Sequence, residues 1–147
     1  MRIDRVLNDA ARRAVTYLDS LAGRPVAPTR EAIAGLRALD EPLPDEPTDP
    51  SEVIRLLDDA CSAATMAMAG PRFFGFVTGG SLPAALGANW IAGAWDQNSA
   101  FASVTPGTAV LEEVALRWLI DLFGFPPGTA GAFVTGATMA NFTALGC

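Results

Sequence analysis

The sequence contains no lysine and no histidine. All ten of its basic residues are arginine, and sixteen acidic residues give a net charge of −6. The chain therefore has no imidazole to act as a base or metal ligand, and no lysine amine to bond with a carbonyl group. Nucleic-acid binding requires clustered positive charge, which an acidic chain without a basic patch does not offer. We expect no metal site and no nucleic-acid partner.

Cysteine is scarce as well. Cys61 and Cys147 are far apart in the sequence and indicate no disulfide framework. Residues 1–5 are charged and do not have the pattern of a signal peptide. We therefore expect a location in the reducing cytoplasm.

Charge is nearly absent from the second half of the chain. Residues 73–95 form an uncharged run long enough to cross a bilayer, but several glycines and Pro83 interrupt it, which argues against a membrane span. Burial explains the run better, yet a chain of this length has too little interior to hide so much apolar sequence. We therefore expect a partner that covers this half: a second subunit, further chain, or both. The only charged residues after residue 72 are Asp96, Glu112, Glu113, Arg117 and Asp121.

Apolar periodicity and capping residues predict a series of helices. The expected ranges are residues 4–21, 29–39, 49–69, 81–96 and 105–123. Three of these helices start at a capping residue, namely Thr29, Asp49 followed by Pro50, and Thr105 followed by Pro106. On the first helix, Arg12, Arg13 and Asp19 are interpreted as a solvated face. On the last, the expected buried face consists of Val110, Leu111, Val114, Trp118, Leu119 and Leu122, and Glu113 and Arg117 are spaced as an ion pair.

Two loops between these helices have unusual compositions. Residues 72–81 carry three phenylalanines in four positions among glycines, which predicts an irregular, tightly packed segment. It is either plain core or the aromatic wall of a pocket, where small residues let a ligand approach. Residues 96–101 form a polar break in an apolar region, and such groups require partners or a ligand.

The stretch from Gly131 to Leu145 predicts a strand, a tight turn and a helix. Ala132–Thr135 suits a buried strand, Gly136 allows a sharp turn, and residues 137–145 have helical spacing. This geometry directs backbone N–H groups and a helix dipole at one spot, which favours an anion, and Thr138 adds a hydroxyl. Two interpretations stay open: a phosphate cradle, or an ordinary turn with a capping threonine, because the pattern lacks the spaced glycines and the lysine of a phosphate loop.

Three segments taken in this order resemble the amino-terminal part of the pyridoxal-phosphate-dependent decarboxylases of aromatic amino acids and glutamate. The joint spacing is more specific than any one motif, and the resemblance covers essentially the whole chain. The segments are Pro71–Phe76 before the Gly-Gly-Ser turn, Thr105-Pro106 leading to Leu111-Glu112-Glu113 and Trp118, and Phe133–Asn141.

The resemblance implies a fold-type-I α/β architecture with a mostly parallel sheet, and an enzyme of amino-acid metabolism. Residues 1–72 would form a helical segment that wraps around the partner subunit of a homodimer. Residues 73–147 would begin the large domain that binds pyridoxal 5'-phosphate. The substrate would be a small-molecule amino acid.

The resemblance also assigns site residues. Gly136, Ala137 and Thr138 would hold the cofactor phosphate through backbone N–H groups and the threonine hydroxyl. A second set would line the substrate pocket, with the last two reaching a pocket that belongs to the neighbouring subunit: Phe73, Phe76, Val77, Gly79, Asn98 and Ala100.

Two departures from the family pattern qualify this implication. The family usually has histidine at the position of Gly70. Its ring-stacking histidine, its aspartate partner of the pyridine nitrogen and its cofactor-binding lysine all lie beyond the phosphate motif, and this chain holds none of them. We expect a fragment, the front third of such an enzyme, without catalytic residues and inactive alone. An aminotransferase or related lyase of the same fold, or a non-catalytic remnant, are the alternatives.

Overall fold

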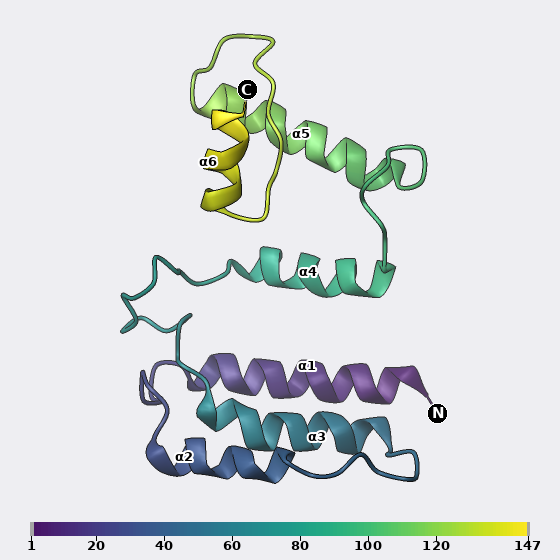
Figure 1. The fold of residues 1–147 in the computed structure, drawn as a ribbon, viewed down its shortest axis with the longest axis vertical. Helices are drawn as coiled ribbons and strands as arrows, with labels where there is room; N and C mark the ends of the chain where they lie inside the picture. The colour runs from purple at the N-terminus through teal and green to yellow at the C-terminus, as the bar shows by residue number, and fades with distance from the viewer. Residues whose placement is uncertain (1, 147) are drawn as a thin grey trace. The chain divides into compact units, whose positions relative to one another are not determined.

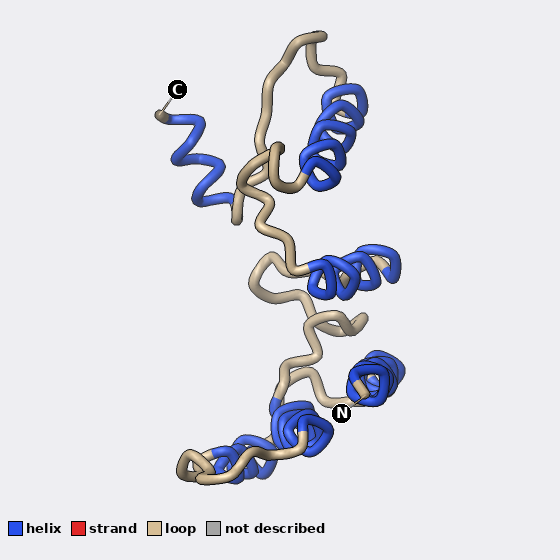
Figure 2. Tube along the Cα trace, turned by 90° about the vertical axis from the view of Figure 1, so that its right-hand side faces the viewer, coloured by secondary structure: helices blue, strands red, loops and turns tan. Residues whose placement is uncertain are grey.

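The computed structural model describes residues 2–146, and within this range it consists of helices joined by loops, with no β-strand (Figures 1 and 2). The chain divides into two units: unit 1 is Met1–Ala85 and unit 2 is Leu86–Cys147. Each unit is described by itself below. The domain boundary expected after residue 72 stays a prediction.

Unit 1 is a layer of helices built around α1 (Ile3–Ser20) and α3 (Pro50–Cys61). These two helices lie side by side and run in the same direction, and the short α2 (Arg30–Gly35), continued by the 3₁₀ turn η1 (Leu36–Leu39), lies on the other side of α3 (Figure 1). The expected helix over residues 4–21 is therefore confirmed as α1. Because the helices are parallel, the N-terminal turns of α1 lie beside those of α3, and the C-terminal turns lie beside each other as well.

The capping residues of unit 1 act as the sequence predicts. The hydroxyl oxygen of Thr29 accepts a hydrogen bond from the Ala32 N–H at 3.1 Å, and a carboxylate oxygen of Asp49 accepts one from the Ser51 N–H at 2.8 Å. Each side chain satisfies a backbone donor that has no partner inside its helix. Local chemistry alone thus sets where these two helices begin.

The end of α3 differs from the prediction. The helix expected to run to residue 69 ends at Cys61 and is followed by the 3₁₀ turn η2 (Ser62–Ala64). The Ser62 carbonyl accepts hydrogen bonds from the Thr65 hydroxyl at 2.8 Å and from the Arg24 guanidinium, instead of continuing the helical ladder. Beyond this point the Ala67 N–H donates to the Val26 carbonyl at 2.9 Å. Tertiary contacts therefore terminate a helix whose periodicity could continue.

Unit 2 contains most of α4 (Pro83–Trp95), together with α5 (Pro106–Leu122) and α6 (Ala137–Leu145). The loop after α5 packs against that helix at Gly131, where an added Cβ would lie only 2.7 Å from Cδ1 of Leu116. The start of α5 follows the prediction in position but not in mechanism. The hydroxyl of Thr105 makes no cap and instead faces the preceding loop, within 3.0 Å of the Asn98 carbonyl.

Three expectations for unit 2 are wrong. Residues 132–135 do not form a strand, because a strand needs a neighbouring strand to hydrogen-bond with and the described residues supply none. The α/β class is therefore not visible in residues 2–146, which are helical. The expected buried face of α5 is largely exposed, with Trp118 72% and Leu122 75% accessible, because the described residues of unit 2 supply no layer that covers it; Val114 and Leu119 are half-buried. The expected ion pair between Glu113 and Arg117 does not form among the described residues either.

The interior is correspondingly small. Among residues 2–146, the buried apolar side chains are those of Leu21 and Ala67, which are 8% and 2% exposed, and both lie in unit 1. No helix in the described part of the chain has both the length and the apolar character needed to cross a bilayer.

Candidate functional site

The predicted phosphate cradle lies at the N-terminus of α6. The first hydrogen bond at this end of the helix runs from the Ala140 N–H to the Gly136 carbonyl at 3.0 Å. The N–H groups of Ala137, Thr138 and Met139 therefore have no acceptor inside the helix. They point out of the helix terminus, where the aligned peptide dipoles place a partial positive charge.

The side chains around this terminus leave the donors accessible. None of the hydrogen bonds among residues 2–146 involves the Thr138 hydroxyl, whereas the Thr143 hydroxyl on the same helix donates to the Met139 carbonyl at 2.9 Å. The backbone of Gly136 is extended, and nothing lies within 4 Å of the position a Cβ would take. The N-terminus of α6 is thus accessible to an anion and offers it backbone N–H donors and one hydroxyl that has no other partner among the described residues.

The chemistry of this corner fits a phosphate group. Residues 122–147 carry no charged side chain, so no carboxylate of this segment repels an anion and the attraction comes from the backbone and the hydroxyl. The donor set suits the phosphate of pyridoxal 5'-phosphate, but it contains nothing that would hold the rest of that cofactor. Gly136, Ala137 and Thr138 are brought together here as the sequence predicts, and their function stays a prediction.

The aromatic segment, residues 73–79, belongs to unit 1. It is irregular, as predicted, but the expectation of tight packing is wrong, because Phe74 is 93% and Phe76 77% exposed. The rings of Phe73 and Phe76 lie against each other with centroids 6.1 Å apart and planes at 34°. The segment therefore presents an apolar aromatic surface to its surroundings.

The tip of the aromatic segment has a strained backbone. The Thr78 N–H donates to the Gly75 carbonyl at 3.3 Å, and the two residues between them, Phe76 and Val77, have φ angles of 57° and 55°. Such a turn normally holds Asn-Gly, since a side chain in the left-handed region costs about 1–2 kcal/mol per residue. Gly79 follows in open space. Nothing in the sequence Phe-Val predicts this conformation.

The third predicted set, Asn98 and Ala100, forms a local turn in unit 2. The side-chain oxygen of Asn98 accepts a hydrogen bond from the Ala100 N–H at 3.1 Å. The backbone carbonyl of Asn98 accepts from the hydroxyl of Thr105, which is 4% exposed. The polar break thus finds partners within its own loop. A role for these two residues in a pocket stays a prediction.

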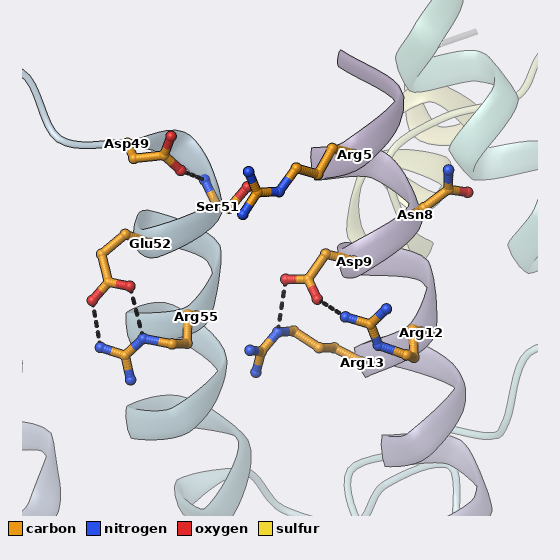
Figure 3. Close-up of a pocket in the computed structure, with 9 residues that line it drawn as sticks. All are labelled: Arg5, Asn8, Asp9, Arg12, Arg13, Asp49, Ser51, Glu52 and Arg55. Atoms are coloured by element: carbon orange, nitrogen blue, oxygen red, sulfur yellow. Dashed lines mark hydrogen bonds and ion pairs between the residues drawn. The ribbon is translucent and has the colours of Figure 1, made fainter. Parts of the chain in front are cut away.

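A polar hollow of about 580 Å³ between α1 and α3 has no counterpart in the sequence predictions (Figure 3). One of its lining residues is Arg13, which donates to Asp9 at 3.0 Å, to Asp58 at 2.9 Å and to Asp59 at 3.1 Å. Arg13 was expected on a solvated face, and this expectation is wrong because the guanidinium bridges two helices. Asp58 and Asp59 lie 45 and 46 positions away in the sequence, so no local pattern reveals them. The hollow is lined by Arg5, Asn8, Asp9, Arg12, Arg13, Asp49, Ser51, Glu52 and Arg55.

Two carboxylates of this hollow, those of Asp9 and Glu52, are stabilised in their charged form by arginines. The hydrogen bond from Arg13 lowers the pKa of Asp9 below its ordinary value of 3.8. Arg55 donates to Glu52 at 2.8 Å and lowers the pKa of that carboxyl below 4.5. The charges of Arg12, Arg13 and Arg55 are therefore matched by neighbouring acids, and Arg13 joins α1 to α3.

Comparison with known proteins gives a partial match. No protein-family model and no solved structure matches the chain. A curated relative, an aromatic-L-amino-acid decarboxylase of Bacillus atrophaeus, is 27% identical over 131 residues, which are 89% of this chain. The chain spans only 27% of the length of that protein. It is therefore similar to one part of a decarboxylase.

Proposed function

We propose that this chain forms the phosphate-binding portion of a pyridoxal-phosphate-dependent amino-acid decarboxylase, a carboxy-lyase of the cytoplasm. The observation that carries the proposal is the open, donor-lined terminus of α6, in a chain similar to part of such a decarboxylase. The terminus offers donors without acceptors, which is the complement of a phosphate group.

The residues of the cradle have distinct functions in this proposal. The N–H groups of Ala137 and Thr138 bind phosphate oxygens, and the Thr138 hydroxyl donates a further, charge-assisted hydrogen bond. Gly136 leaves room for the phosphate because it has no side chain. When bound, pyridoxal phosphate supplies an electron sink for the charge that remains when carbon dioxide leaves an amino acid.

The substrate side is proposed to be built from the other two sets of residues. The exposed aromatic segment gives an apolar wall for the side chain of an amino acid, through Phe73, Phe76, Val77 and Gly79. Asn98 and Ala100 border a pocket of the neighbouring subunit in a homodimer. The exposed face of α5 supports an assembly of this kind, because it remains uncovered within unit 2.

The chain alone is proposed to have no decarboxylase activity. It contains no lysine to bond with the cofactor and no histidine to stack on it or to carry a proton. Its contribution is to bind and orient the phosphate end.

The experiment that tests the proposal is a titration of the complete protein with pyridoxal phosphate. Thr138→Val removes one charge-assisted hydrogen bond of roughly 1.5–3 kcal/mol, so the Kd should rise by about 10- to 150-fold. The matched control is Thr143→Val on the same helix, whose hydroxyl already donates to the Met139 carbonyl. Parental affinity in Thr138→Val would show that the phosphate binds elsewhere.

A further inference from the structure

The guanidinium of Arg24 joins two segments of unit 1. It lies over the ring of Tyr17, 4.3 Å from the centroid, at the end of α1. One of its nitrogens donates to the Ser20 hydroxyl at 3.3 Å, and another donates to the Ser62 carbonyl just after α3. One side chain thereby connects the C-terminal ends of the two parallel helices.

The backbone of Arg24 connects this junction to the aromatic segment. Its carbonyl accepts a hydrogen bond from the guanidinium of Arg72 at 2.6 Å, and Arg72 immediately precedes Phe73. The chain also passes closely at Gly70, where a Cβ would lie 3.1 Å from the Ala67 carbonyl oxygen and 3.4 Å from that of Leu21. The base of the aromatic segment is therefore held against the only buried apolar residues of the described chain.

The tip of the aromatic segment depends on such an anchored base. Phe76 and Val77 are held in the left-handed region, which costs energy and persists only where the surrounding structure enforces it. Both side chains are exposed, and the contacts within the tip are the hydrogen bonds from Thr78 to the Gly75 carbonyl and the pairing of the Phe73 and Phe76 rings. The contacts that connect this turn to the rest of unit 1 lie at its base, at Gly70 and Arg72.

We propose that Arg24 is a positioning residue: it sets the aromatic segment in place through Ser62 on one side and Arg72 on the other. That the positioned segment contacts a substrate rests on the proposed function, whereas the mechanical role of Arg24 does not. Lysine cannot replace it, because a single ammonium group cannot stack on Tyr17 and also reproduce the two directed hydrogen bonds of the planar fork.

The first test measures amide hydrogen exchange in the complete protein. The amides of Phe73 and Thr78 report on the segment, since they donate to the carbonyls of Gly70 and Gly75. Loss of a hydrogen bond that involves a charged group should accelerate their exchange about tenfold or more in Arg24→Ala and in Arg24→Lys, while the α1 amides keep the parental rate.

Two further variants complete this test. Arg72→Ala removes only the bond to the Arg24 carbonyl from an exposed position, so it gives a result even where Arg24→Ala does not fold. Arg72→Ala should accelerate the hydrogen exchange of the Phe73 and Thr78 amides. Arg37→Ala is the matched control, because the Arg37 side chain is exposed and makes no hydrogen bond or ion pair among residues 2–146; the exchange rates of both amides should stay at the parental value. Parental exchange of Phe73 and Thr78 in Arg72→Ala would overturn the proposal.

The second test is kinetic and separates this inference from the proposed function. In the complete protein with pyridoxal phosphate, Arg24→Lys and Arg72→Ala should raise the KM for the amino acid about tenfold while the Kd of the cofactor stays at the parental value. An unchanged KM alongside faster exchange would overturn the substrate role of the segment. A parental protein that releases no carbon dioxide from any amino acid would overturn the proposed function, and the exchange result would still decide whether Arg24 positions the segment.

Discussion

In unit 1 the helices are joined by polar contacts between side chains, whereas in unit 2 the helices present apolar side chains that nothing in the unit covers. Every ion pair among residues 2–146 is formed by residues in the range 2–59, and therefore lies in unit 1. In unit 2 the side chains of Trp118, Phe142 and Leu145 are 72%, 74% and 89% exposed. Two units of one chain thus differ in what holds their helices together.

The difference teaches which unit depends on additional structure. In unit 1, Arg13 and Arg55 are paired with acids of the same unit and the starts of α2 and α3 are capped, although apolar side chains such as those of Phe74 and Phe76 are exposed there too. Unit 2 has exposed apolar area that would stabilise an interface by roughly 25 cal/mol per Å² if it were covered. Soluble monomers rarely keep large contiguous patches of this kind.

The largest expected effect concerns association. At micromolar concentration the chain should sediment as a dimer or larger species and bind an apolar dye, because unit 2 exposes apolar residues with few charges among them. Leu122→Asp should weaken both signals. Leu43→Asp should not, although Leu43 is 92% exposed, since it lies singly in the acidic loop of unit 1. A compact monomer without dye binding would contradict the claim that unit 2 exposes an apolar surface and unit 1 does not depend on one.

The second expected effect is a dependence of unit 1 on pH. Asp9 and Glu52 have lowered pKa values in the folded protein, so their contribution to stability is fully present above the ordinary values of 3.8 and 4.5. It is lost as the pH falls through the lowered values, because the unfolded state then binds more protons. The free energy of unfolding, measured with urea at pH 7, 4 and 3, should therefore decrease.

The control for this pH effect removes the cation. In Arg13→Met, Asp9 has lost its main hydrogen-bond donor, so the decrease in stability between pH 7 and pH 3 should become smaller than in the parent. The same decrease in parent and variant would show that the ion pairs of unit 1 do not carry the pH dependence.

The smallest expected effect compares two threonines. Thr29→Ala removes the cap of α2 and should reduce the free energy of unfolding by about 1 kcal/mol. Thr143→Ala in α6 removes a hydroxyl that only donates back to its own helix, so the change should stay within roughly 0.5 kcal/mol. Thermal or urea unfolding followed by circular dichroism measures both. If both variants lost the same free energy of unfolding, the cap at Thr29 would contribute no more to stability than the Thr143 hydroxyl inside α6.

Much of the helical framework could be predicted from the sequence because its signals are local. The starts of α2 and α3 follow from Thr29 and Asp49, whose side chains need only neighbouring N–H groups to form a cap. The start of α6 at residue 137 follows from Gly136 and the helical spacing after it. The candidate phosphate site could be located for the same reason, since all of its donors come from consecutive residues.

Other features were decided by contacts between distant parts of the chain. The end of α3 depends on Arg24, and the burial of Arg13 depends on Asp58 and Asp59. Periodicity cannot reveal such contacts, because it reports only which face of a helix is apolar. The same limit made the expected solvent exposure of Arg13 and the expected length of α3 wrong, whereas Arg12 and Asp19 are exposed as expected.

The sequence by itself determined where helices begin, that charge is confined mostly to the first 72 residues, and that the terminus of α6 offers donors to an anion. Only the tertiary structure decided that residues 132–135 are not a strand and that Phe76 and Val77 adopt left-handed angles. The physical reason is the range of the interactions: a cap is completed within three residues, whereas a strand requires a second strand and a strained turn requires an anchored base.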